Sequence, residues 1–160
     1  MTLKAGDKAP AFKLPDQNGK IHDLKDYKGQ WVLVYFYPKD DTPGCTKEAC
    51  AIRDAWADYK KEKVQVFGVS ADSPASHTKF ITKFTLPFTL LADEDKVMVK
   101  AYDVWGKKKF MGREYEGIFR HSFLINPEGK IAKIYDEVKP DEHAAEVLAD
   151  VRAFKKAAKT

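Results

Sequence analysis

Two cysteines five positions apart, Cys45 and Cys50, are the residues of this chain whose type and spacing could do chemistry. They are its only cysteines. Cys45 ends the stretch YPKDDTPGC, which places two prolines, a glycine and a threonine directly after the most apolar run of the sequence. Such a pair could be structural, could bind a metal or could carry out redox chemistry, and each possibility makes different demands on the neighbouring residues.

Cys45 lies where a helix is expected to begin. From this residue onward, apolar side chains recur at spacings of four, three, four and three, which predicts one apolar face of a helix over residues 45–61. A helix N-terminus favours a thiolate through its partial positive charge and its free N–H groups, and Pro43 and Gly44 let the backbone turn tightly into it. A small buried cysteine that happens to begin a helix is the alternative.

Acidity alone would not make this cysteine a catalyst. An unperturbed thiol with a pKa near 8.5 is already a few per cent thiolate at neutral pH, so full ionisation gains only about thirtyfold, or roughly 2 kcal/mol. A reactive site therefore needs donors directed at the charge that develops during reaction. The local candidates are the Thr42 side chain and the backbone N–H groups of Gly44 and Cys45.

The position of Cys50 suggests a conformational role. In a continuous α-helix, residues five apart lie about 7.5 Å along the axis and about 140° around it, so their Cα atoms are roughly 8 to 9 Å apart. A disulfide needs less than about 7 Å. A Cys45–Cys50 bond would therefore require the first turn of the helix to unwind. The alternative is that Cys50 only fills space beside the helix.

Metal binding and thioredoxin-type exchange fit the sequence less well. The histidines lack the paired spacing of zinc ligands, so no metal and no cofactor are expected; they are His22, His77, His121 and His143. A thioredoxin-type redox motif would be Cys-x-x-Cys, and the spacing here is two residues longer.

Strands alternate with helices along the rest of the chain. Residues 31–37, WVLVYFY, are apolar without alternation, which predicts a central strand covered on both faces. This order indicates a mixed sheet with helices on both faces, as in a thioredoxin-like α/β fold, although periodicity alone leaves other three-layer arrangements open. The further strands are expected at 64–70, 88–91, 118–125 and 131–137, the helices at 74–84, 93–102 and 144–154, and a basic loop at 105–116.

Size and charge limit the classes of function. The chain has 160 residues, 44% of them hydrophobic, and we expect one domain over residues 1–160. Its formal charge of +4 is scattered, which is compatible with an acidic protein partner but does not indicate nucleic-acid binding. The first twenty residues lack the apolar segment of a signal peptide, and the longest apolar run is about a third of a membrane span. We expect a cytoplasmic protein with no membrane partner, in which a permanent disulfide would be unusual.

The sequence resembles the peroxiredoxins, specifically the PrxQ or bacterioferritin comigratory protein (BCP) group. The Pro-x-x-x-Thr-x-x-Cys signature of that family is met by Pro38, Thr42 and Cys45, and it continues as CTKEAC with the second cysteine of the group. The similarity extends through AYDVWGKKKFMGREYEGIFRHSFLINPEGKI and covers nearly the whole chain.

The resemblance implies a role for each residue around Cys45. Cys45 would be the peroxidatic cysteine, whose thiolate attacks the peroxide O–O bond and becomes a sulfenic acid. Thr42 would hydrogen-bond the peroxide and the thiolate, and Pro38 would shield the sulfur. Arg120 would stabilise the thiolate and the transition state with a fixed positive charge. Glu48 would help to orient that arginine.

The resemblance also implies how the cycle closes. Cys50 would condense with the sulfenic acid to give an intramolecular disulfide, which thioredoxin or a similar dithiol would reduce. The substrates would be hydrogen peroxide and organic hydroperoxides, and the protein would be a monomer. Two alternatives stay open, namely a protein thiol–disulfide oxidoreductase and a redox-responsive binding module.

Overall fold

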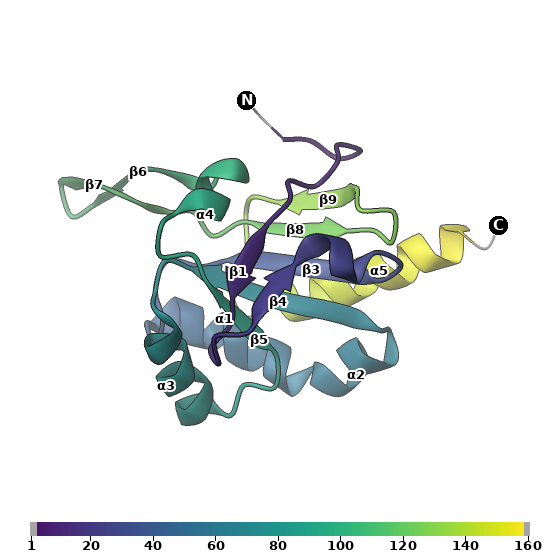
Figure 1. Cartoon of the computed structure of the whole chain (residues 1–160), viewed down its shortest axis with the longest axis horizontal. Helices are drawn as coiled ribbons and strands as arrows, with labels where there is room; N and C mark the ends of the chain where they lie inside the picture. The colour runs from purple at the N-terminus through teal and green to yellow at the C-terminus, as the bar shows by residue number, and fades with distance from the viewer. Residues whose placement is uncertain (1–2, 159–160) are drawn as a thin grey trace.

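The fold is built around a five-stranded mixed sheet whose middle strand is the apolar run predicted to lie there (Figure 1). The computed structural model describes residues 3–158. Strands β4 and β5 continue parallel from β3 on one side, whereas β8 pairs antiparallel with β3 on the other side and β9 antiparallel with β8. The order is β5-β4-β3-β8-β9. The bounds are β3 Trp31–Phe36, β4 Val64–Ser70, β5 Thr89–Ala92, β8 Ser122–Ile125 and β9 Ile131–Tyr135.

Strand β3 is buried on both faces, as its continuous apolar sequence predicts. Leu33 and Tyr35 pack on one face with apolar residues of four helices, α1 (Pro43–Asp54), α2 (Trp56–Lys61), α3 (Pro74–Phe84) and α5 (His143–Ala158). Val34 and Phe36 pack on the opposite face with the helix α4 (Val97–Ala101) and the N-terminal segment. That segment contains β1 (Lys13–Pro15), β2 (Ile21–Asp23) and the 3-10 helix η1 (Leu24–Tyr27). The predicted α/β class with a thioredoxin-like arrangement is confirmed.

Helix α1 carries both cysteines in one unbroken segment. It begins at Pro43, after Thr42 in the N-cap position, so Cys45 is its third residue. The helix predicted to residue 61 is interrupted at Ala55, where α1 ends, and residues 56–61 are helical as α2. The Ala55 amide is shared between the carbonyls of Ala51 and Ile52, which tightens the last turn of α1 and changes the direction of the chain.

Residues 105–116 differ most from expectation. The predicted basic loop is a hairpin of β6 (Trp105–Phe110) and β7 (Arg113–Ile118), which extends from the body of the molecule in Figure 1. Its tight turn is made by Met111 and Gly112, both with positive φ, the combination that suits the twist of a hairpin. Lysine is uncommon in strands, and for that reason the composition of this segment indicated a loop.

Other predicted elements are shorter in the structure. The strand expected at 118–125 begins at Ser122, since Ile118 belongs to β7. The helix expected at 93–102 is reduced to α4, because Lys96 is left-handed and the buried Asp93 carboxylate accepts the Val99 amide at 2.8 Å. Within residues 3–158, no helix combines the length and the apolar character needed to cross a membrane.

Gly68 on β4 lies in a tightly packed part of the sheet, on the face covered by the cysteine helix. A Cβ atom at this position would lie 2.7 Å from Leu90 Cδ2 and 2.8 Å from both Cζ and the hydroxyl oxygen of Tyr35. We therefore expect Gly68→Ala to lower the free energy of unfolding by about 1–3 kcal/mol, measured by urea denaturation. Gly117→Ala is the control, because its Cβ would first meet the flexible Lys108 side chain at 3.1 Å. Equal stability of the two variants would contradict this account of the packing.

Candidate active site

Cys45 packs among apolar residues of the core, and one charged donor is directed at its sulfur. The residue is 1% exposed and belongs to the core cluster beneath α1. Arg120 Nη2 lies 3.4 Å from the sulfur and donates to it. Arg120 is in the short connection between β7 and β8, 75 residues away in sequence. The fold thus brings a permanent cation to the start of α1.

Arg120 is held by a second contact with its other nitrogen. Nη1 donates to Glu48 Oε1 at 2.7 Å, and the Glu48 side chain is fully buried. The guanidinium therefore joins two residues of α1, Cys45 and Glu48, through its two arms. A fork of this kind has a defined orientation that a lysine ammonium would not have.

Gly44 leaves the space in which the guanidinium lies. A Cβ atom at this position would be 3.0 Å from Arg120 Nη2, closer than such contacts normally are. The backbone conformation does not itself require glycine, since no positive φ is involved. The structure thus gives a steric reason for glycine at position 44, in addition to the backbone N–H donor considered from the sequence.

Burial controls the charge of Glu48. It raises the pKa of this carboxyl from 4.5 to about 7, and the charge and hydrogen bond of Arg120 only partly oppose it. Its second oxygen, Oε2, is buried without a hydrogen-bond partner in the described part of the chain. The nearby Tyr35 hydroxyl is also buried without a hydrogen-bond partner among the described residues. Its pKa is raised first by burial and then by the Glu48 charge. The interior next to Cys45 is therefore poorly solvated.

Thr42 and Pro38 lie on the loop that leads into α1. Both are half-buried. The Thr42 hydroxyl donates to the Lys39 carbonyl at 2.9 Å, so it can accept a hydrogen bond from another molecule while this contact holds. The Thr42 carbonyl accepts the Thr46 amide at 2.8 Å and opens the helical ladder. The roles in substrate binding and shielding stay predictions for these two residues.

Cys50 lies five residues further along the same helix. Both cysteines are free thiols, and Cys50 is half-buried whereas Cys45 is buried. Because both belong to α1, the helical geometry keeps their Cα atoms roughly 8 to 9 Å apart. The structure is therefore that of the reduced protein with the helix intact.

Lys108 is a cation near the site that the sequence analysis placed in a solvated loop. In β6 it lies on the face opposite Lys107 and Lys109, and it is the only one of the three that is half-buried. Its ammonium donates to the Ile118 carbonyl at 2.9 Å. Burial and then the Arg120 charge lower the pKa of Lys108, while the Cys45 charge opposes them. Strand alternation in the hairpin would have been the signal for it.

Known proteins are similar to this chain in sequence and in fold. The AhpC/TSA family pattern matches residues 5–134. Peroxiredoxin Bcp of Escherichia coli K12 is 51% identical over 146 residues, covering 91% of this chain and 94% of that protein. A mutant PrxQ structure from Xylella fastidiosa has a TM-score of 0.91 and 33% identity, covering 97% of this chain and 99% of the other. The bacterioferritin comigratory protein of Xanthomonas campestris, described with alkyl peroxide reduction activity, has a TM-score of 0.87 and 35% identity, covering 94% and 99%.

The thioredoxin-like fold, the buried Cys45 beside Arg120 and these similarities together define a thiol-dependent peroxidase. The chain belongs to the AhpC/TSA family, and its similarities lie with the peroxiredoxins of the Bcp/PrxQ group. The resemblance noted from the sequence is thereby confirmed at the level of family and fold.

Removing the two-armed contact of Arg120 should slow the peroxide reaction of Cys45. We expect Arg120→Met to reduce the second-order rate constant by about 10²–10³, as for other preorganised donors, and Arg120→Lys to recover only part of it. Stopped-flow measurement of Cys45 oxidation checks this. Arg152→Met is the control, because Arg152 contacts Glu62 on the surface. A rate constant for Arg120→Met equal to that of the control would contradict the assignment.

The buried Glu48 should make stability depend on pH. Its pKa is about 7 in the folded protein against an ordinary value of 4.5, so between these pH values the native state holds more protons than the unfolded state. The free energy of unfolding should therefore fall as pH rises through this window, by up to about 3 kcal/mol. Urea denaturation of the native protein and Glu48→Gln at pH 5 and pH 7.5 measures it. The free energy of unfolding of Glu48→Gln should not fall in this window. If the difference in stability between the two proteins does not change with pH, the raised pKa of Glu48 is contradicted.

Proposed function

We propose that this peroxiredoxin reduces hydroperoxides through Cys45 and closes its cycle with an intramolecular Cys45–Cys50 disulfide. In the first step the Cys45 thiolate attacks the terminal oxygen of the hydroperoxide. The S–O bond forms as the O–O bond breaks, the leaving alkoxide or hydroxide takes a proton, and Cys45 becomes a sulfenic acid. The observation that carries this proposal is the Arg120 guanidinium 3.4 Å from the Cys45 sulfur, with its other arm on Glu48.

The site supports this step by its electrostatics. Negative charge moves during attack from the sulfur toward the departing oxygen, and Arg120 is already oriented to stay close to both. The cation needs no reorientation, because Glu48 holds it in place. Thr42, whose hydroxyl has free lone pairs, is placed at the helix start to accept a hydrogen bond from the substrate. Pro38 and the Gly44 N–H group complete the proposed substrate-binding residues.

The second step uses Cys50. Its thiol attacks the sulfenic sulfur, forming the S–S bond and releasing water. Since α1 keeps the two Cα atoms farther apart than a disulfide allows, the first turn of α1 must open before this step. The resolution step is therefore coupled to local unfolding of the helix.

The proposal extends to the natural substrates and to the reductant. We infer that hydrogen peroxide and organic hydroperoxides both react, a view supported by the alkyl peroxide reduction described for the Xanthomonas campestris relative. The disulfide is returned to two thiols by thioredoxin or a similar dithiol, which leaves as its own disulfide. We propose that the protein acts as a monomer in the cytoplasm.

Mapping thiols after a single oxidation tests the proposal. One equivalent of peroxide added to the reduced protein should convert Cys45 and Cys50 into one intramolecular disulfide, identified by peptide mass spectrometry. Cys50→Ser should still consume one equivalent of peroxide but should lose turnover with thioredoxin. A Cys45 that stays a free thiol, while the protein exchanges with protein disulfides, would favour a thiol–disulfide oxidoreductase instead.

A further inference from the structure

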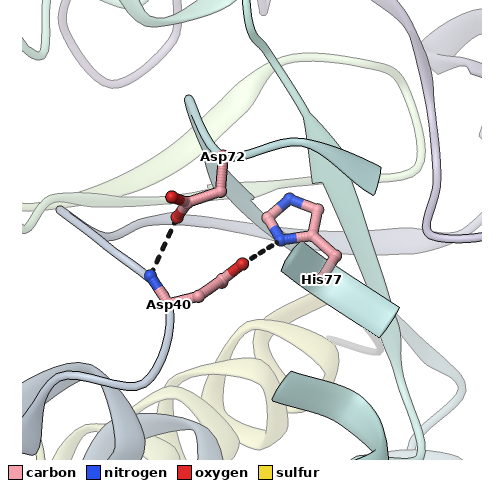
Figure 2. Close-up of side chains that lie close together, drawn as sticks. All are labelled: Asp40, Asp72 and His77. Atoms are coloured by element: carbon pink, nitrogen blue, oxygen red, sulfur yellow. Dashed lines mark hydrogen bonds and ion pairs between the residues drawn. The ribbon is translucent and has the colours of Figure 1, made fainter. Parts of the chain in front are cut away.

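A second cluster of titratable side chains lies where the loop before α1 meets α3, formed by Asp40, Asp72 and His77 (Figure 2). The His77 and Asp40 side chains are 0% and 4% exposed. His77 Nδ1 lies 2.7 Å from Asp40 Oδ2, and the Asp40 backbone amide donates to Asp72 Oδ2 at 2.8 Å. The cluster joins residues up to 37 positions apart in sequence.

Its ligand atoms lie within 4.8 Å of one another, as in a metal site, but hydrogen bonds already use them. Asp40 Oδ2 also accepts from Ser76 Oγ at 2.8 Å, and Asp40 Oδ1 accepts from the Tyr37 hydroxyl at 2.5 Å. Asp72 Oδ2 also accepts from Ser70 Oγ at 2.8 Å. A metal would have to displace these donors, so the arrangement favours a hydrogen-bonded anchor.

The contacts of His77 show that a proton lies between it and Asp40. Its Nε2 is 2.8 Å from the Leu91 carbonyl, which can only accept, so Nε2 carries a hydrogen. Nδ1 then faces a carboxylate oxygen at 2.7 Å, an arrangement that is attractive only when a proton joins the two. The pair is thus joined by a short hydrogen bond in a site closed to solvent, where such a bond is costly to break.

The anchor is adjacent to the reactive loop. Asp40 lies between Pro38 and Thr42, and the next residue, Asp41, has a left-handed φ of 58°. The Asp41 carboxylate pairs with the surface residue Lys83 at 2.8 Å, and both side chains are largely exposed. The chain is therefore firmly held at Asp40, whereas Asp41 and Pro43 are exposed and the next buried residue is Cys45, which Arg120 contacts.

We propose that Asp40 and His77 are positioning residues for the peroxidase reaction. They fix the loop that presents Pro38 and Thr42 to Cys45, and they set the boundary beyond which the chain opens when α1 unwinds for disulfide formation. This inference rests on the proposed function, because it concerns the helix opening that the Cys45–Cys50 disulfide requires. It adds a fixed point, buried between α3 and β5, that neither touches the substrate nor contacts the sulfur.

The molecule contains a matched control pair. Asp16 and His22 also lie 2.7 Å apart with 7% exposure each, and the other nitrogen of His22 contacts the Tyr27 hydroxyl at 2.7 Å. That pair belongs to the β1–β2 hairpin, with Asp16 in its connecting turn and His22 in β2, and not to the loop before α1. His77→Gln and His22→Gln therefore each disrupt one buried pair of the same kind.

Two rate constants distinguish positioning from general stability. Stopped-flow kinetics with excess peroxide gives oxidation of Cys45 and the later formation of the disulfide as separate phases. We expect His77→Gln to slow oxidation by about tenfold to a hundredfold, because Pro38 and Thr42 lose their alignment, without slowing disulfide formation. His22→Gln should leave both phases unchanged. Equal effects of the two variants on both phases would overturn the proposal.

Two further measurements keep the test decisive. Asp40→Asn, with Asp16→Asn as its control, should reproduce the split between the two phases if His77→Gln does not fold. In the native protein, the Asp40 amide should stay protected from hydrogen exchange in both the reduced and the disulfide forms. Loss of its protection on oxidation would contradict the anchor even where the disulfide forms, whereas an unoxidised Cys45 in the native protein would instead refute the proposed function.

Discussion

The two-armed contact of the Arg120 guanidinium with Cys45 and Glu48 is the interaction on which the site depends. A buried carboxylate with an oxygen that lacks a partner is costly, and Arg120 offsets only part of that cost. The geometry must therefore come from the rest of the fold. The sheet holds the connection that carries Arg120, and the apolar face of α1 holds Glu48 and Cys45 opposite it.

Helix α1 has to stay folded while Cys45 reacts with peroxide and has to open for disulfide formation. Its residues differ in burial in a way that fits these two demands. Cys45, Glu48, Ala49 and Ile52 form its buried face. In the turn that begins it, Pro43 is exposed and Gly44 and Thr46 are half-buried, so Cys45 is the residue of that turn that packs in the core. Oxidation removes the thiolate that Arg120 contacts and so weakens the contact holding the first turn. The buried Asp40–His77 pair holds the chain in place on the N-terminal side of the segment that opens.

The parts of this account that are local in sequence could be predicted, and the others could not. The placement of Pro38 and Thr42 before a helix and of Cys45 at its start follows from residue types and spacing, and the buried central strand follows from an unbroken apolar run. Arg120, 75 residues from Cys45, entered only through family resemblance. The Asp40–His77 contact depends on how α3 packs and had no short-range signal. Lys108 had one in the strand alternation of its hairpin, but the lysine content of that segment favoured a loop.

Hydrogen exchange along α1, before and after one equivalent of peroxide, tests most directly the claim that catalysis couples chemistry at Cys45 to opening of its helix. In the reduced protein the amides from Thr46 to Cys50 should be protected. In the disulfide form they should lose protection, while those of β3 and Asp40 keep it. A disulfide between Cys45 and Cys50 with the α1 amides still protected would contradict the account.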